Sequence, residues 1–423
     1  MMGDVERISQ CCRVLSDPTS AADAKAAADG ALSAVRAQPR AWAVADAMLS
    51  ASADVWTHLF ALQLLQSEVA RVWRPGGRGT AEQAELRSAV MSRVRALASV
   101  DSPPRDVAIM RDKLATVLVS VLRAEGAPSW APFLAQLLPA VDTPAAARTV
   151  LRICRLLGEE VLDEQAGPLS ASHARQVRAA LAEQPAGGRA EQAIGAQLLA
   201  LATAALREAA AAASGGADGD ASLTADGLGV VELFAPHLPA ALVWPRTGGG
   251  GANANALREC VLALLAVPRT RAGALGALGG MMRARLAPPD GRPAAERDER
   301  AWHEREMASA AIAAQNILLP AATRRSAPAG DDAAARSWPA AAGARPPTLG
   351  WPPRQAQALL AFCLALWRAH ARSLAPRGDT DAPAADAHGA ELSQLWASCL
   401  CFVLTASLSA AQPRPRARSA VSG

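Results

Sequence analysis

Residues 111–164 read RDKLATVLVSVLRAEGAPSWAPFLAQLLPAVDTPAAARTVLRICRLLGEEVLDE and decide the fold. Apolar residues in the first part recur at steps of three and four, which places them on one face of a helix. The segment GAPSWAPF, residues 126–133, then contains a glycine and two prolines, which end helices and turn the chain. A short second helix follows, and a third helix ends in LLGEEVLD, residues 156–163. This order predicts helices that fold back on one another.

Three segments, one before this stretch and two that overlap it, show the same helical spacing. Residues 54–73, 105–124 and 145–162 each carry apolar residues at steps of three or four. The first of them stops at the sequence RPGG, residues 74–77, which is a strong helix terminator. No segment shows the strict alternation and β-branched enrichment that are typical of a sheet. We therefore predict an all-α fold.

Successive helices, taken in pairs, form units of about forty residues, the length of HEAT-type helical hairpins. Such hairpins cannot bury both of their apolar faces alone, so they stack on their neighbours into a superhelical α-solenoid with a concave binding surface. Units are expected to begin near Ala21, Asp54, Arg105, Ala145, Ala190 and Ala252.

The repeat pattern is interrupted between residues 283 and 350. This segment is rich in Ala, Pro, Gly and Arg, and it leaves room for one helix, near residues 302–319. The predicted organisation is an N-terminal arm or helix (1–20), HEAT repeats (21–184), further HEAT repeats (190–282), a largely disordered insert (283–350), terminal HEAT helices (351–410) and a disordered tail (411–423).

Charge and cysteine content argue against two kinds of function. The formal net charge of +4 is small for 423 residues, and the basic residues are scattered, so direct nucleic-acid binding is not expected. The seven cysteines show no metal-ligand spacing, and most of them fall on apolar helix faces. We therefore expect reduced, buried thiols and no metal site.

One segment, residues 392–411, carries no charge and has the length of a membrane span. Ser, Thr and Gln interrupt it, and its strongest apolar positions fall on one helix face, so we favour a buried repeat helix, with a membrane span as the alternative. The N-terminus carries acidic residues early and lacks a continuous apolar region, so a cleaved secretory signal is not expected.

No catalytic or cofactor-binding motif is recognised in the chain. The sequence HERE at residues 303–306 lacks the second histidine of a helical zinc site, and we interpret it as a solvated helix face. Cys399 and Cys401 have the wrong spacing for a redox or zinc pair, which favours core packing. The glycine run 248–251 lacks the residues of a phosphate loop. We therefore expect neither an enzyme nor a bound cofactor.

Three tryptophans lie near the ends of predicted helices. Trp42, Trp73 and Trp130 could stack on nucleic-acid bases, but in a repeat protein such residues more often fill the space between hairpins. We favour the packing role.

Several motifs resemble one family in their order along the chain. QPRAW (38–42) and FALQLL (60–65) resemble the N-terminal domain of the importin-β, or karyopherin, superfamily, and SWAPF (129–133) resembles its next hairpin. LLGEEVLD (156–163) resembles the exportin-1 type specifically. The resemblance extends over residues 21–282 and, more loosely, over residues 351–410.

The resemblance implies a nuclear transport receptor that shuttles between nucleus and cytoplasm, binds the small GTPase Ran in its GTP form, and contacts export cargo and nucleoporins. It places the GTPase on the second helices of the first hairpins, here residues 40–50, 81–98 and 130–141. The exposed polar residues expected on these helices are Arg40, Asp46, Glu85, Arg87, Arg93, Arg95 and Gln136.

Length is the main departure from that family. Exportin-1 relatives are more than twice as long, and their cargo groove lies beyond the part matched here, so a truncated receptor that lacks the export-signal groove is expected. Two other functions stay open: a non-transporting α-solenoid scaffold and an import receptor of the same superfamily. The exportin-type stretch at 156–163 argues against the import receptor.

Overall fold

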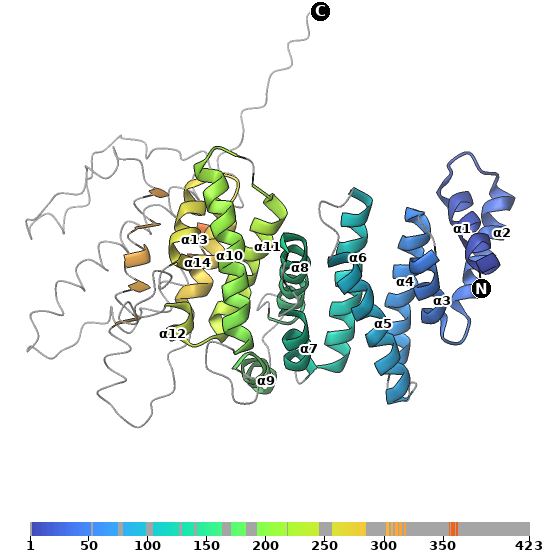
Figure 1. The fold of residues 1–423 in the computed structure, drawn as a ribbon, viewed down its shortest axis with the longest axis horizontal. Coiled ribbons are helices and arrows are strands. Elements are labelled where there is room, and N and C mark those ends of the chain that lie inside the picture. The colour runs from blue at the N-terminus through green and yellow to red at the C-terminus, as the bar shows by residue number, and fades with distance from the viewer. Residues whose placement is uncertain are drawn as a thin grey trace, which may run out of the picture. The chain divides into compact units, whose positions relative to one another are not determined.

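The structure is a computed structural model, and all of its elements are helices (Figure 1). No β-strand is found in the described part of the chain, in agreement with the all-α prediction. The described residues are 2–51, 54–74, 79–98, 105–126, 129–138, 141, 143–162, 171–182, 193–217, 219–244 and 256–284, with separate positions within 302–318 and 355–362.

The predicted helices are present with nearly the expected ends. Residues 54–73, 105–124 and 145–162 correspond to α4, α6 and α8, respectively. The full set is α1 (Met2–Ser16), α2 (Ala22–Arg36), α3 (Ala41–Ala51), α4 (Val55–Val72), α5 (Thr80–Ala98), α6 (Arg105–Glu125), α7 (Trp130–Leu137), α8 (Pro144–Val161), α9 (Ala171–Ala182), α10 (Ile194–Ser214), α11 (Ala221–Phe234), α12 (Ala240–Val243), α13 (Ala256–Ala266) and α14 (Arg271–Met282), with a 3-10 turn, η5 (Ala235–His237).

Side-chain caps explain where several helices begin. The Asp54 carboxylate accepts a hydrogen bond from the Thr57 amide at 2.9 Å, and the Thr143 hydroxyl accepts one from the Ala146 amide at 3.1 Å. Asp220 accepts from the amides of Ser222 and Leu223. The first amides of a helix have no partner within it, so these caps fix the starts of α4, α8 and α11.

The chain divides into two compact units, Met1–Ala205 and Leu206–Gly423, and each is described by itself. In the first unit α4 packs on α6 and α6 packs on α8, so these three helices form a continuous row. Helix α3 lies against α4 and also touches α5, which lies against α6 and α8. Figure 1 shows α3 to α8 following one another as a stack.

The pairing of neighbouring helices differs from the prediction. The units expected from the sequence pair α2 with α3 and α4 with α5, whereas α3 packs mainly on α4, α5 on α6, and α1 on α2. The connections on either side of α3 and α5 are all short, so their lengths allow either pairing. Spacing of apolar residues therefore predicts the helices but cannot choose which neighbour each one pairs with.

The core of the first unit is unevenly distributed. In α4 and α8 about half of the residues are buried, including Leu64, Leu65, Leu151 and Ile153. Four residues of α3 are buried, two of them alanines, and the buried side chains described in α5 are Leu86, Val90, Met91 and Val94. Hydrophobic burial therefore holds the row of α4, α6 and α8 more strongly than it holds α3 and α5.

The second unit is built on a close contact between α11 and α14. A side-chain carbon placed on Gly280 would lie 2.6 Å from the Glu232 carbonyl oxygen, so only glycine allows the two helix backbones to approach this closely. The buried Trp244 indole donates a hydrogen bond to the Met281 carbonyl at 3.0 Å and so joins the end of α12 to α14.

The segment near residue 302 is helical at every described position from 302 to 318, as predicted. The interpretation of residues 303–306 as a solvated face is wrong, however, for the two described residues, His303 and Glu306. His303 is buried and lies edge-on to Trp244 with ring centroids 6.5 Å apart, while Glu306 pairs with Arg258 at 2.8 Å. The local sequence is charged and suggests exposure. Burial comes instead from contacts with Trp244 and Arg258, which lie far away in the sequence. The segment 392–411 lies outside the described residues.

Candidate protein-binding face on α3 and α5

The stretch that decides the fold forms a corner between α6 and α7. Helix α6 ends at Glu125, and Gly126 takes a left-handed conformation with φ of 83° that closes its last turn. Trp130 is almost fully buried, and its indole N–H donates to the Leu122 carbonyl at 3.2 Å. The tryptophan therefore satisfies one of the last carbonyls of the preceding helix. Its role is structural, as the sequence predicted, and Trp42 is buried likewise.

Six of the seven predicted contact residues lie on or beside α3 and α5. Arg40 directly precedes α3, Asp46 lies on α3, and Glu85, Arg87, Arg93 and Arg95 lie on α5. Because α3 touches α5, the fold brings these residues together. Gln136 is exposed on α7, whose main described helix contact is with α9.

Four of the six residues pair with one another. Arg93 lies 2.7 Å from the Asp46 carboxylate through Nε, and it donates to the Asp46 carbonyl at 3.1 Å and to the Ser50 hydroxyl. Arg40 pairs with Glu85 and lies over the Trp42 ring at 5.1 Å. The sequence predicted exposed contact residues, and the structure shows them joining α3 to α5.

Arg40 also has an unusual backbone. Its φ of 59° lies in the left-handed region, which residues other than glycine rarely adopt. The sequence placed Arg40 within a helix, but it precedes the first turn of α3.

The other two arginines differ in their surroundings. Arg87 pairs with Glu125 of α6 at 3.3 Å, while Arg95 is exposed near the end of α5. Arg95 and Gln136 are therefore both accessible to a partner.

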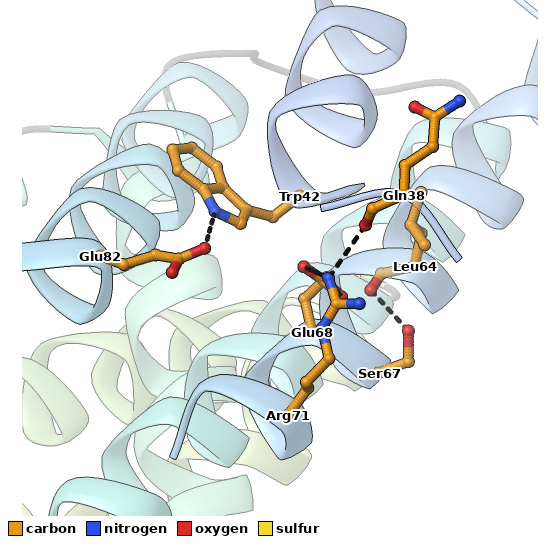
Figure 2. A network of polar contacts seen from close by, with 7 residues as sticks. All are labelled: Gln38, Trp42, Leu64, Ser67, Glu68, Arg71 and Glu82. Carbon is orange, nitrogen blue, oxygen red and sulfur yellow. Dashed lines mark hydrogen bonds and ion pairs between the residues drawn. The ribbon is translucent and has the colours of Figure 1, made fainter. Parts of the chain in front are cut away.

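The prediction missed the polar partners of Trp42 and Arg71. The Trp42 indole donates to the Glu82 carboxylate at 3.2 Å, which adds a further contact between α3 and α5. Figure 2 shows this pair beside Arg71, which lies between the buried Glu68 carboxylate and the Gln38 carbonyl. A buried indole N–H needs an acceptor, so Glu82, an acidic residue on the first turn of α5, was the signal available.

The polar contacts between helices share a characteristic sequence separation. Arg40 and Glu85 are 45 residues apart, Asp46 and Arg93 47, and Arg87 and Glu125 38. The pairs between α6 and α8, Arg123 with Glu160 and Asp112 with Arg152, are 37 and 40 residues apart. Each pair therefore joins positions about one predicted repeat apart.

The described cysteines are free thiols, and Cys12, Cys154 and Cys260 are buried, as predicted, while Cys11 is half-buried. Burial raises the pKa of Cys154 to about 12, and burial together with the nearby Asp54 carboxylate raises the pKa of Cys12 to about 11. Within the described ranges no group of His, Cys, Asp or Glu side chains is arranged to hold a metal ion. None of the helices that the structure describes has the length and apolar character needed to cross a bilayer.

This geometry defines stacked helices that are joined both by apolar packing and by polar contacts. Residues 107–194, from α6 into α10, match the family described as Exportin 1-like protein. The chain therefore contains an exportin-1-like domain, and the resemblance inferred from residues 156–163 is confirmed.

A similar protein is Exportin-1 of Dictyostelium discoideum, which is 26% identical over 162 residues. The matched part covers 38% of this chain and 15% of the relative, so the similarity is distant and partial.

Proposed function

We propose that this chain is an exportin-1-like nuclear transport receptor, built as a HEAT-repeat α-solenoid, that binds Ran in its GTP form. The observation that supports this proposal best is the family match over residues 107–194, which includes the corner at Trp130 and the helices α6 and α8. The stacked contacts of α3 to α8 are those that a solenoid requires.

In this proposal the GTPase contacts α3, α5 and α7 through Arg40, Asp46, Glu85, Arg87, Arg93, Arg95 and Gln136. Export cargo and nucleoporins are the other partners, and the protein shuttles between nucleus and cytoplasm without catalysing a reaction. In receptors of this family Ran-GTP and cargo strengthen each other's binding, and such coupling is reciprocal because both effects are one free energy.

A pull-down with Ran locked in its GTP or GDP form tests the proposal. We expect selective retention of the GTP form by the full chain. Arg95→Glu reverses an exposed charge on α5, so it should weaken retention about fivefold or more. Arg7→Glu on α1, where the side chain is 71% exposed, is the matched control and should leave retention unchanged. Equal or absent retention of the two Ran forms by the unaltered chain would contradict the proposal.

The alternative is a non-transporting scaffold that binds proteins without regard to nucleotide. The internal pairs Arg40–Glu85 and Asp46–Arg93 favour it, because these residues already have a structural role. The same pull-down separates the two functions, since a scaffold would not distinguish the GTP and GDP forms.

A further inference from the structure

We propose that the contact between α3 and α5 is a polar clasp that opens while the row of α4, α6 and α8 stays packed. The polar clasp consists of Arg40, Trp42, Asp46, Ser50, Glu82, Glu85 and Arg93. Since a partner could use some of these residues, the inference deepens the proposed function and for that part rests on it, but the opening itself can be measured without any partner.

The contacts that define the clasp are polar. They are the pair of Arg40 with Glu85, the hydrogen bond from Trp42 to Glu82 at 3.2 Å, and the contacts of Arg93 with Asp46 and Ser50. Hydrogen bonds and ion pairs at a surface exchange readily for contacts with water and dissolved ions. The clasp is therefore easier to open than an apolar contact of similar extent.

Exposure differs along the clasp. About half of the Arg40 and Glu85 side chains are exposed, at 53% and 51%, so water already reaches this pair. Arg93 and Asp46 are less exposed, at 26% and 35%, and Arg93 contacts three oxygens of α3. Opening is expected to begin at Arg40 and to be limited by Arg93.

The neighbouring row provides the contrast. Ion pairs also join α6 to α8, Arg152 with Asp112 at 3.2 Å and Arg123 with Glu160 at 2.9 Å. These two helices, however, bury long apolar side chains such as Leu118, Leu122, Leu151 and Leu157 as well. Loss of the ion pairs should leave α6 packed on α8, whereas loss of the clasp removes the ion pairs and hydrogen bonds that join α3 to α5.

The backbone at Arg40 supports the same reading. Its left-handed φ is held while the guanidinium lies over Trp42 and pairs with Glu85. A strained conformation persists only while surrounding contacts fix it. Release of the clasp would let Arg40 relax, which favours the open form.

Opening has a consequence for binding. A partner that forms ion pairs with Arg40, Asp46, Glu85 or Arg93 competes with the pairs that these residues form with one another. A charged partner that binds these residues would therefore shift the clasp toward its open form. Conditions that open the clasp would strengthen the binding of that partner by the same factor.

Hydrogen exchange measured by mass spectrometry on the full chain tests the clasp. Raising the salt concentration from about 50 mM to about 500 mM shortens the Debye length and weakens exposed ion pairs. We expect exchange of the α3 amides to rise about fivefold and that of α4 and α6 to stay constant. Constant exchange in α3, or an equal rise in α4 and α6, would overturn the proposal.

Charge exchange supplies the second measurement. Asp46→Arg or Arg93→Asp alone should raise α3 exchange at low salt to the high-salt level, and the double variant should restore low exchange. The matched controls are Asp112→Arg and Arg152→Asp, which disrupt a pair in the apolar row and should leave α6 exchange unchanged. An equal effect of the control pair on α6, or no recovery in the double variant, would contradict the clasp.

The salt experiment on the unaltered chain decides the question if a variant does not fold. Since neither measurement contains Ran, failure of the clasp and failure of the proposed function are distinguishable.

Discussion

Trp42 and Trp130 illustrate how one side chain can join two helices in this protein. Both are buried, and each indole N–H reaches an acceptor on another helix, the Glu82 carboxylate or the Leu122 carbonyl. Their rings contribute buried apolar surface, while the hydrogen bond from the indole N–H fixes the orientation of the ring. Trp73, which was predicted to have the same role, is only half-buried at the end of α4.

The cysteines give a prediction for a single side chain. Cys154 should react with iodoacetamide near pH 8 at least about a hundredfold more slowly than Cys11, because burial keeps its thiol protonated and Cys11 is half-buried. Peptide mapping after timed labelling measures both rates. In denaturant the two should react alike, and similar rates in the folded protein would contradict the burial of Cys154.

The sign of the pH effect follows from the raised pKa. Above the ordinary thiol pKa of 9.0 the unfolded state loses a proton that folded Cys154 keeps until about pH 12. The stability linked to this thiol is therefore fully present below pH 9 and declines as the pH rises through that window.

Individual helices could be predicted well from the sequence because their signals are local. Apolar spacing and the terminator after residue 73 gave α4 almost residue for residue. Helix α7 is shorter than the predicted 130–141 and ends at Leu137. The pairing of helices could not be predicted, since α3 has short connections to both α2 and α4 and its apolar face suits either.

The corner between α6 and α7 gives a prediction for these elements. Trp130→Phe keeps most of the apolar ring but removes the donor to the Leu122 carbonyl, so it should lower the free energy of unfolding by about 1 kcal/mol. Thermal unfolding followed by circular dichroism measures the change. Trp73→Phe, at a half-buried position, is the control and should cost less. An equal effect of the two changes would show that the hydrogen bond contributes nothing.

At the scale of the whole molecule, the division into two units predicts that a destabilising substitution in one unit leaves the stability of the other unit unchanged. Gly280→Ala should lower the stability of the second unit by about 1–3 kcal/mol, because the added carbon meets the Glu232 backbone. Hydrogen exchange should rise in α11 and α14 and stay constant in α4 and α6. Contacts in each unit are made between near neighbours, which is why the effect should not spread.

Gly30→Ala is the matched control for that change. Gly30 lies in α2 with no atom within 4 Å of an added carbon, so alanine should stabilise the helix by about 0.5–1 kcal/mol. A rise in exchange throughout the chain after Gly280→Ala would contradict the division into two independent units.

The candidate site could be predicted in part. The family resemblance selected the helices, and position on them then suggested Arg40, Asp46, Glu85 and Arg93 as polar candidates. Their pairing with one another could not be predicted, because each pair joins two repeats and depends on how far α3 and α5 are offset along their axes. The pair Glu68–Arg71 escaped notice for another reason: it lies within α4, but the burial of Glu68 is decided by neighbouring helices.

Most ion pairs between helices join residues that are 37 to 48 positions apart, and this separation has a consequence for how the sequence evolves. A mutation that reverses Asp46 in a descendant sequence leaves Arg93 facing a like charge, so compensating changes should accumulate 47 residues downstream. Co-variation at this distance would mark repeat boundaries in homologues too diverged for motif matching. A descendant that loses or gains a helix would keep these ion pairs only if the interval between the partners stays the same. Otherwise several charged residues would have to be replaced together.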